Sequence, residues 1–280
     1  MVIAEEVSAG IFVLRYQAMD LNICVVRGDG ALLVVDTGSS PAEAAEIEAD
    51  LRQLGSCPLV GVVNTHAHFD HTFGNQHFGP ASAFDVPIYG HHRLPAHLIE
   101  HEGPRLQRWR LCTGDEPPRD WADVVITPPT NLVTDRQAIV VGGRVVELWP
   151  LGAAHTDTDL VVHVPDADTW IVGDLVEESG PPMYGSGCFP LDWPDAVAQL
   201  LEDIGASHLV IPGHGRPVPR GFVVDQLADL AAFAAQASAC WSAGLSIDEA
   251  LAADQRWPFP TAGLRLAVQR SYAALDARQH

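Results

Sequence analysis

The sequence contains no lysine, and its 16 basic residues stand against 36 aspartate and glutamate residues, for a formal net charge of −20. Because a nucleic-acid groove needs a broad cationic face, this balance argues against nucleic acid as a substrate or partner. The absence of lysine also excludes mechanisms that form a Schiff base with a lysine side chain. A carboxylate on a substrate must therefore be held by arginine, by a backbone amide or by metal ions.

Two further features are missing from the chain. No stretch approaches the roughly 18 uncharged apolar residues that a membrane helix needs, and the first residues lack the basic region of a signal peptide. The five cysteines are scattered and never form a C-x-x-C pair, which argues against a disulfide framework and a thiolate zinc site. We therefore expect a cytoplasmic protein with reduced thiols that does not enter a membrane, in which Cys188 serves for packing.

Hydrophobic periodicity and turn residues predict two β-rich halves with helices between and after them. The predicted strands are 11–14, 21–27, 31–35, 59–63, a stretch from 139 through 145–148, 160–164, 170–172 and 208–211. The predicted helices are 41–54, 194–204 and most of 222–277. We interpret this order as one α/β domain over residues 1–280, a four-layer αββα sandwich in which two sheets face each other with helices outside. An oligomer is compatible with this pattern.

Two segments do not follow the pattern of the sandwich. Residues 91–129 are rich in His, Arg, Pro and Trp with little periodicity, and we interpret them as a helical lid inserted over the site. Residues 222–280 are interpreted as a helical C-terminal extension. Five side chains of the lid could line a pocket: His91, His92, His97, His101 and Trp109. The commoner outcome for such residues is a solvated or locally bonded side chain.

A dense cluster of histidine and aspartate follows the predicted strand 59–63. The segment 65–71, T-H-A-H-F-D-H, places three imidazoles and one carboxylate within six residues: His66, His68, Asp70 and His71. Imidazole and carboxylate suit zinc, manganese or iron, and the alternation of a strand end points His66 and His68 to one side. Histidines bonded to backbone carbonyls in a polar loop are the ordinary alternative, which such a cluster disfavours.

Four more polar residues each follow or end a predicted strand elsewhere in the chain. They are Asp36, His155, Asp174 and His214. His214 lies in the segment P-G-H-G and Asp174 in the segment V-G-D. Because strand ends can meet at one edge of a sheet, this recurrence favours a metal site assembled from distant segments.

These segments, taken in order over residues 8 to 220, resemble the sequence motifs of the metallo-β-lactamase superfamily. The resemblance implies that His66, His68 and His155 bind one metal ion, that Asp70, His71 and His214 bind a second, and that Asp174 lies between both. It also implies that Asp36 orients a ligand imidazole instead of taking part in catalysis. With an aspartate at position 174, the chain resembles the hydroxyacylglutathione hydrolase and lactonase branch more than it resembles dedicated zinc β-lactamases.

The expected function is hydrolysis of an ester, thioester, lactone or amide bond in a small molecule. Two divalent ions, zinc before manganese or iron, would stabilise a metal-bound hydroxide as the nucleophile, with Asp70 passing a proton to the leaving group. Tyr184, on a loop after Asp174, is a candidate substrate-binding residue, against the alternative of a tyrosine packed in its loop. A rival function is that of a mononuclear iron persulfide dioxygenase, which the same fold can host.

Overall fold

The computed structural model describes residues 1–112, 119–252 and 256–278. Its strands are β1 (Ala4–Ser8), β2 (Ile11–Tyr16), β3 (Leu21–Gly28), β4 (Ala31–Val35), β5 (Leu59–Val63), β6 (Ile88–His91), β7 (Asn131–Val133), β8 (Gln137–Val141), β9 (Arg144–Pro150), β10 (Leu160–Val164), β11 (Thr169–Glu177), β12 (Leu209–His214) and β13 (Val218–Pro219). Its main helices are α1 (Pro41–Leu51), α2 (Phe69–Thr72), α3 (Asn75–Phe78), α4 (Leu94–His97), α5 (Gly103–Arg110), α6 (Trp193–Leu201), α7 (Arg220–Ser242), α8 (Ile247–Ala252) and α9 (Arg265–Arg278).

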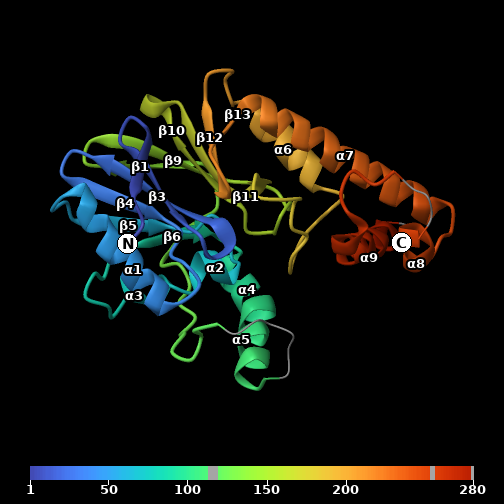
Figure 1. Ribbon diagram of the computed structural model, residues 1–280, viewed down its shortest axis with the longest axis horizontal. Coiled ribbons are helices and arrows are strands. Elements are labelled where there is room, and N and C mark those ends of the chain that lie inside the picture. Colours follow the sequence, from blue (N-terminus) through green and yellow to red (C-terminus); the bar gives the residue numbers. More distant parts are fainter. Residues whose placement is uncertain (113–118, 253–255, 279–280) are drawn as a thin grey trace.

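The strands form two faces of a sandwich joined through β3 and β12 (Figure 1). The order along the hydrogen-bonded path is β7-β6-β5-β4-β3-β12-β11-β10-β9-β8. The first three predicted strands form an antiparallel meander, since β2 pairs with β3 and β3 with β4. Beyond it, β4, β5, β6 and β7 pair in parallel. The carboxyl ends of β4 and β5, where Asp36 and the histidine cluster follow, are therefore neighbours in space.

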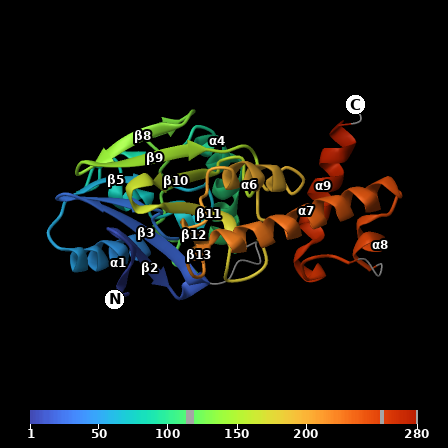
Figure 2. The same cartoon turned by 90° about the horizontal axis from the view of Figure 1, so that it is seen from above.

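Three apolar clusters hold the four layers together. Between the two faces pack side chains such as Val26 and Leu33 from one half and Val162 and Ile211 from the other. The outer side of the first face packs on α1, and the outer side of the second packs on α6 and α7 (Figure 2). Helix α1 begins where predicted, because the hydroxyl of Ser40 accepts a hydrogen bond from the backbone N–H of Glu43. The predicted αββα sandwich is confirmed.

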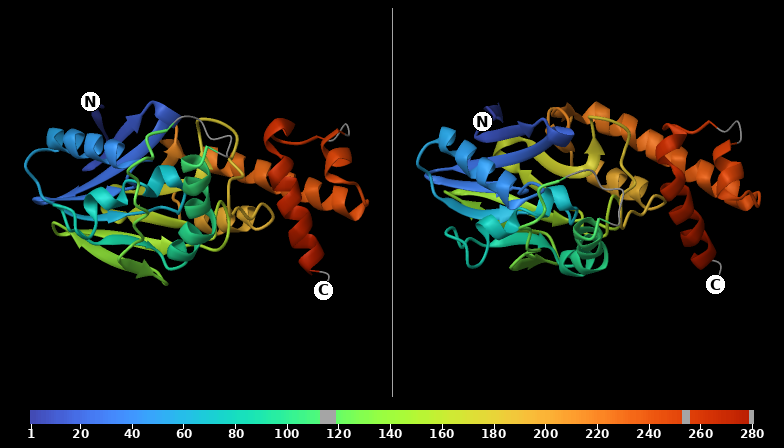
Figure 3. Two further views of the ribbon diagram at one scale, coloured as in Figure 1. Left: turned by 90° about the horizontal axis from the view of Figure 1, so that it is seen from below. Right: turned by 60° about the horizontal axis from the view of Figure 1, so that its bottom comes forward.

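The segments outside the sandwich differ from the expectation in detail. Strands β1, β6 and β7 were not predicted, and β6 and β7 carry the parallel pairing into and out of the segment interpreted as a lid. Within that segment α4, a π-helical turn over Leu98–Glu102 and α5 form one helical run beside α2, while 113–118 lie outside the described residues (Figure 3). In the C-terminal segment, α7 begins against β13 and α6, and its far end projects away from the sandwich together with α8 and α9 (Figures 1 and 3).

Across the described part of the chain, no helix combines the length and hydrophobicity needed to cross a bilayer.

Candidate metal centre

The local fold of the histidine cluster separates its residues into two directions. His66 and His68 lie in the loop after β5, and α2 begins at Phe69 directly after them. One turn of this helix carries Asp70 and His71 away from the two loop histidines, and the hydroxyl of Thr72 donates to the carbonyl of His68 at 3.0 Å. The cluster therefore offers two sets of ligand atoms from one short segment.

The remaining residues reach the same place from other strands. His155 lies in the loop between β9 and β10, and His214 is the last residue of β12. Asp174 was predicted at a strand end, but it lies inside β11, which continues to Glu177. The backbone at Gly173 has a φ of +55°, and a Cβ there would lie 2.7 Å from the side chain of Thr65, so glycine lets β11 approach the loop closely.

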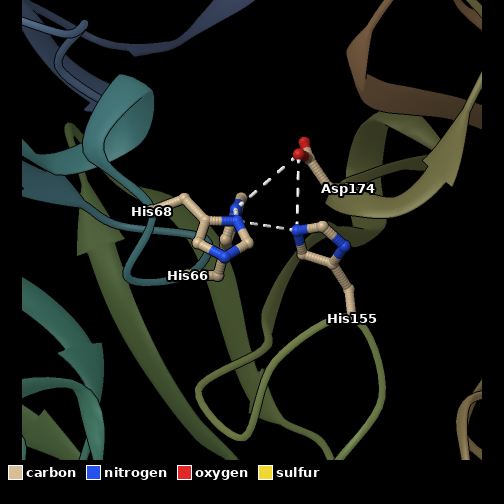
Figure 4. Close-up of side chains that lie close together, drawn as sticks. All are labelled: His66, His68, His155 and Asp174. Atoms are coloured by element: carbon tan, nitrogen blue, oxygen red, sulfur yellow. Dashed lines mark hydrogen bonds and ion pairs between the residues drawn. The ribbon is translucent and has the colours of Figure 1, made fainter. Parts of the chain in front are cut away.

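The first set consists of His66, His68, His155 and Asp174 (Figure 4). Nδ1 of His68 lies 3.1 Å from Nε2 of His66 and 2.9 Å from Nε2 of His155. Oδ2 of Asp174 lies 3.7 and 3.5 Å from those two Nε2 atoms. Zinc bonds of about 2.0–2.1 Å in a tetrahedron place ligand atoms roughly 3.3 Å apart. The four distances of 2.9–3.7 Å thus lie near the spacing that one zinc ion would impose.

The second set consists of Asp70, His71 and His214. Oδ2 of Asp70 lies 3.6 Å from Nε2 of His71 and 3.3 Å from Nε2 of His214. Asp174 faces this set too, since its Oδ1 is 3.4 Å from Nε2 of His71 and its Oδ2 is 3.5 Å from Nε2 of His214. The carboxylate of Asp174 therefore lies between the two sets, as a bridging ligand would.

Hydrogen bonds hold the far side of four imidazoles and leave the inner nitrogen as the free ligand atom. His68 Nε2–H donates to the Ser186 carbonyl at 2.9 Å, and His214 Nδ1–H donates to the Met19 carbonyl at 2.8 Å. Such bonds fix the ring and its tautomer. In the centre, Nε2 of His71 and Oδ1 of Asp174 are buried without a hydrogen-bond partner. Buried polar atoms rarely stay unpaired, so these residues fit metal ions.

Asp36 holds two elements of the centre from behind. It is buried, and its Oδ2 accepts hydrogen bonds from Nδ1–H of His71 and from the hydroxyl of Thr65, both at 2.8 Å. Its Oδ1 accepts from the backbone N–H of Thr65, also at 2.8 Å. Thr65 in turn contacts Nδ1 of His66 at 3.1 Å. One carboxylate thus orients a histidine of each set.

Burial sets the charge state of the first set. Desolvation lowers the pKa of His68 to about 4 and that of His155 to about 3, so both rings are neutral at neutral pH, the form that binds metal. Burial also lowers the pKa of His71, but the carboxylates of Asp174, Asp36 and Asp70 raise it by more, to a value well above the ordinary one.

The centre opens into a cavity of about 530 Å³. Its lining includes His68, Asp70, His155, Asp174 and His214 from the two sets. It also includes Phe69, Glu177 and two arginines, Arg105 and Arg119, which sequence reasoning did not single out. The only signal for the arginines was the basic and aromatic composition of residues 91–129.

The other candidate residues do not line the cavity. Tyr184 packs in the core against Trp193 and Phe233, with ring centroids 5.4 and 4.9 Å away, and its neighbours Met183 and Gly185 line the cavity in its place. His97 is buried and its Nδ1 bonds to Asp157 at 2.9 Å. None of the lid histidines, nor Trp109, lines the cavity among the described residues. Cys188 is buried, as expected.

Comparison with known proteins gives relatives and a family. The chain is 22% identical over 223 residues to a linear primary-alkylsulfatase of a Pseudomonas species, covering 69% of this chain and 41% of that protein. It is 26% identical over 208 residues to an acyl-coenzyme A thioesterase of Gallus gallus, covering 69% and 72%. The structure of a sec-alkylsulfatase from a Pseudomonas species superposes with a TM-score of 0.77 at 18% identity, over 96% of this chain and 50% of that one, which shows a shared fold.

The chain thus spans about two-fifths to one half of the alkylsulfatases it matches. The family profile described as the metallo-beta-lactamase superfamily matches residues 20–230, which include every residue of the two sets. The branch within the superfamily stays a prediction. By this match over most of its length, the chain belongs to the metallo-beta-lactamase superfamily.

Proposed function

We propose that this protein is a hydrolase with two divalent metal ions, zinc before manganese or iron, that cleaves an ester, thioester, lactone or amide bond of a small molecule. One observation carries the proposal: two sets of buried ligand atoms share Asp174 and face one cavity. The relatives named as an alkylsulfatase and a thioesterase support hydrolysis. The cavity volume lies within the range of small-molecule sites.

The residues divide the chemistry among them. His66, His68 and His155 would hold one ion, Asp70, His71 and His214 the other, and Asp174 both. Ions bound there would supply a water of lowered pKa and positive charge for the developing oxyanion.

Asp70 carries the proton in this proposal. Its side chain reaches the cavity, while Nε2 of His214 lies 3.3 Å from its Oδ2 and keeps the carboxylate in place. From this position Asp70 would accept a proton from the attacking water and pass it to the leaving group.

Residues outside the sandwich belong to the same proposal. We regard residues 1–280 as one catalytic domain, with 91–129 as an insertion over the cavity and 222–280 as a helical extension. Arg105 and Arg119 support the first assignment, because both come from the insertion and line the cavity. The rings of Phe233 on α7 and Tyr184, 4.9 Å apart, support the second, because they tie the extension to the loop beside the cavity.

The test is metal content together with turnover. The protein, purified without added metal and then loaded, should bind two equivalents of zinc or manganese and hydrolyse thioesters, lactones or other esters. His214→Ala should bind one equivalent less and lose more than roughly 100-fold in kcat/KM, since even outer partners of ligands cost 10–100-fold. His77→Ala, which removes a histidine bonded to Glu48 on α1, is the matched control and should behave as wild type. One iron with oxygen uptake on a persulfide would make the protein a dioxygenase instead.

A further inference from the structure

Two arginines stand beside the metal centre in a chain dominated by acidic residues. Arg105 lies on α5 and Arg119 follows the insertion's helical run. Their guanidinium carbons lie 5.2 and 4.6 Å from the ring centroid of Phe69, the residue between the two sets of ligands. Both line the cavity into which the ligands open.

The charges of the two arginines are balanced differently. Arg105 forms an ion pair with the fully buried Glu102, with 2.9 Å between Nε and Oε2, and its Nη2 donates to the hydroxyl of Ser186 at 3.1 Å. Arg119 has Met19 Sδ as a hydrogen-bond partner at 3.3 Å, and its Nε is buried without one. Within the described ranges, no carboxylate forms an ion pair with Arg119.

Arg119 is partly buried, and its buried Nε has no hydrogen-bond partner among the described residues. Removing part of a charge from water is costly unless the charge is paired, so an anionic ligand would stabilise Arg119 at this place. Arg119 stacks over Phe69 and Trp121, which holds its planar fork in one orientation at the cavity wall. Such a fork binds carboxylate or sulfate oxygens in pairs.

Apolar side chains line part of the cavity, and two of them, Met19 and Phe69, contact Arg119. Met19, Phe69, Pro181 and Met183 all line it. A substrate that fits this wall has a hydrocarbon part against those side chains and an anionic group at Arg119.

We propose that Arg119 determines specificity: it holds an oxyanion of the substrate, a carboxylate or a sulfate, whose apolar part lies along Met19, Phe69 and Met183. The proposal deepens the proposed function by naming the substrate class, an anionic amphiphile, and for turnover it rests on that function. Binding of an inert anion by Arg119 does not depend on it.

Calorimetry with the metal-loaded protein tests the binding. Hexane-1-sulfonate should bind about tenfold or more tighter than hexan-1-ol, and Arg119→Met should abolish this preference while changing the affinity for the alcohol less than about twofold. Arg119→Lys should retain part of the preference. Arg52→Met, at the residue that follows α1 and pairs with Glu48 of that helix, should match wild type. Equal sulfonate affinity in wild type and Arg119→Met would overturn the proposal, and so would an equal loss for both ligands, which indicates a structural role.

Turnover separates the two sources of the anion. Rates are compared for 4-nitrophenyl hemisuccinate, neutral 4-nitrophenyl butyrate and hexyl sulfate, with wild type and Arg119→Met. A selective loss on the hemisuccinate identifies a carboxylate, and a selective loss of sulfate release identifies a sulfate ester. No turnover of any substrate, with sulfonate binding still dependent on Arg119, refutes the proposed hydrolase and leaves this inference standing. Turnover with sulfonate binding independent of Arg119 refutes only the inference.

Discussion

Replacing Asp36 by asparagine separates the orientation of the ligands from the ligands themselves. Asp36 accepts three hydrogen bonds, from Nδ1–H of His71 and from the N–H and hydroxyl of Thr65. Asparagine keeps one acceptor oxygen and turns an NH₂ group towards a donor. The backbone at Asp36 has a φ of +67°, a conformation that asparagine adopts as readily as aspartate, so the substitution leaves the turn intact.

The size of the effect follows from what is lost. Partners that orient metal ligands are worth 10–100-fold in metal affinity, which is about 1.4–2.7 kcal/mol. A buried donor left without an acceptor costs about 1–3 kcal/mol of folding free energy in addition. Asp36→Asn should therefore bind zinc at least tenfold more weakly and have a lower Tm without metal.

Competition with a chromogenic chelator measures the metal affinity, and thermal unfolding of metal-free protein measures the stability. Asp50→Asn is the matched control. Asp50, on α1, is also buried, and it accepts hydrogen bonds from Val2 N–H and Tyr16 O–H. It should lose stability and keep its zinc affinity. A folded Asp36→Asn protein with zinc affinity within twofold of wild type would refute the reasoning.

Two further changes test the packing and the charge of the centre. Gly213→Ala places a Cβ about 1.9 Å from Oδ1 of Asp174, so the carboxylate must move and chelator competition should show weaker zinc binding. Gly221→Ala is the control: its Cβ meets nothing within 4 Å, so zinc binding should not change. Burial, and next the charge of Asp174, raises the pKa of Glu177 to about 7. In metal-free protein the protonated side chain of Glu177 therefore contributes to stability fully below pH 4.5, and this contribution is lost as the pH rises towards 7. Urea unfolding at pH 5, 6 and 7 measures this change. The free energy of unfolding of Glu177→Gln should rise relative to that of wild type by roughly 1 kcal/mol per pH unit, and a constant difference would contradict the raised pKa of Glu177.

The cluster of candidate metal ligands could be predicted because its signal is local. His66, His68, Asp70 and His71 lie within six residues after one apolar strand, and ligand chemistry alone makes such a cluster unusual. His214 shows the same logic over a longer range, since it ends a strand of the sheet that β3 joins to the first half. For these residues, position at or just after the end of a predicted strand indicated which side chains meet, although Asp174 lies inside β11 and not at its end.

The direction of loop side chains could not be predicted, because distant packing decides it. Tyr184 follows Asp174 along the chain and was a candidate to contact the substrate, with packing in its loop as the alternative. In the structure Phe233 on α7 and Trp193 offer it an apolar surface, and its neighbour Met183 lines the cavity. Arg119 shows the converse: nothing in its sequence neighbourhood indicates that the ring of Phe69, fifty residues earlier, receives it. Such contacts exist only once the layers have assembled.

The charges of the centre explain how the fold can form before a metal ion binds. Asp70 and Asp174 are buried, and burial alone would raise the pKa of each, yet the nearby histidines hold both pKa values low. The same attraction raises the pKa of His71 and His214, so these two rings carry protons where cations would otherwise sit. Two positive rings thus offset two carboxylates in the metal-free protein. A metal ion that binds must displace those protons, which makes affinity rise with pH and couples it to the fold that brings the strands together.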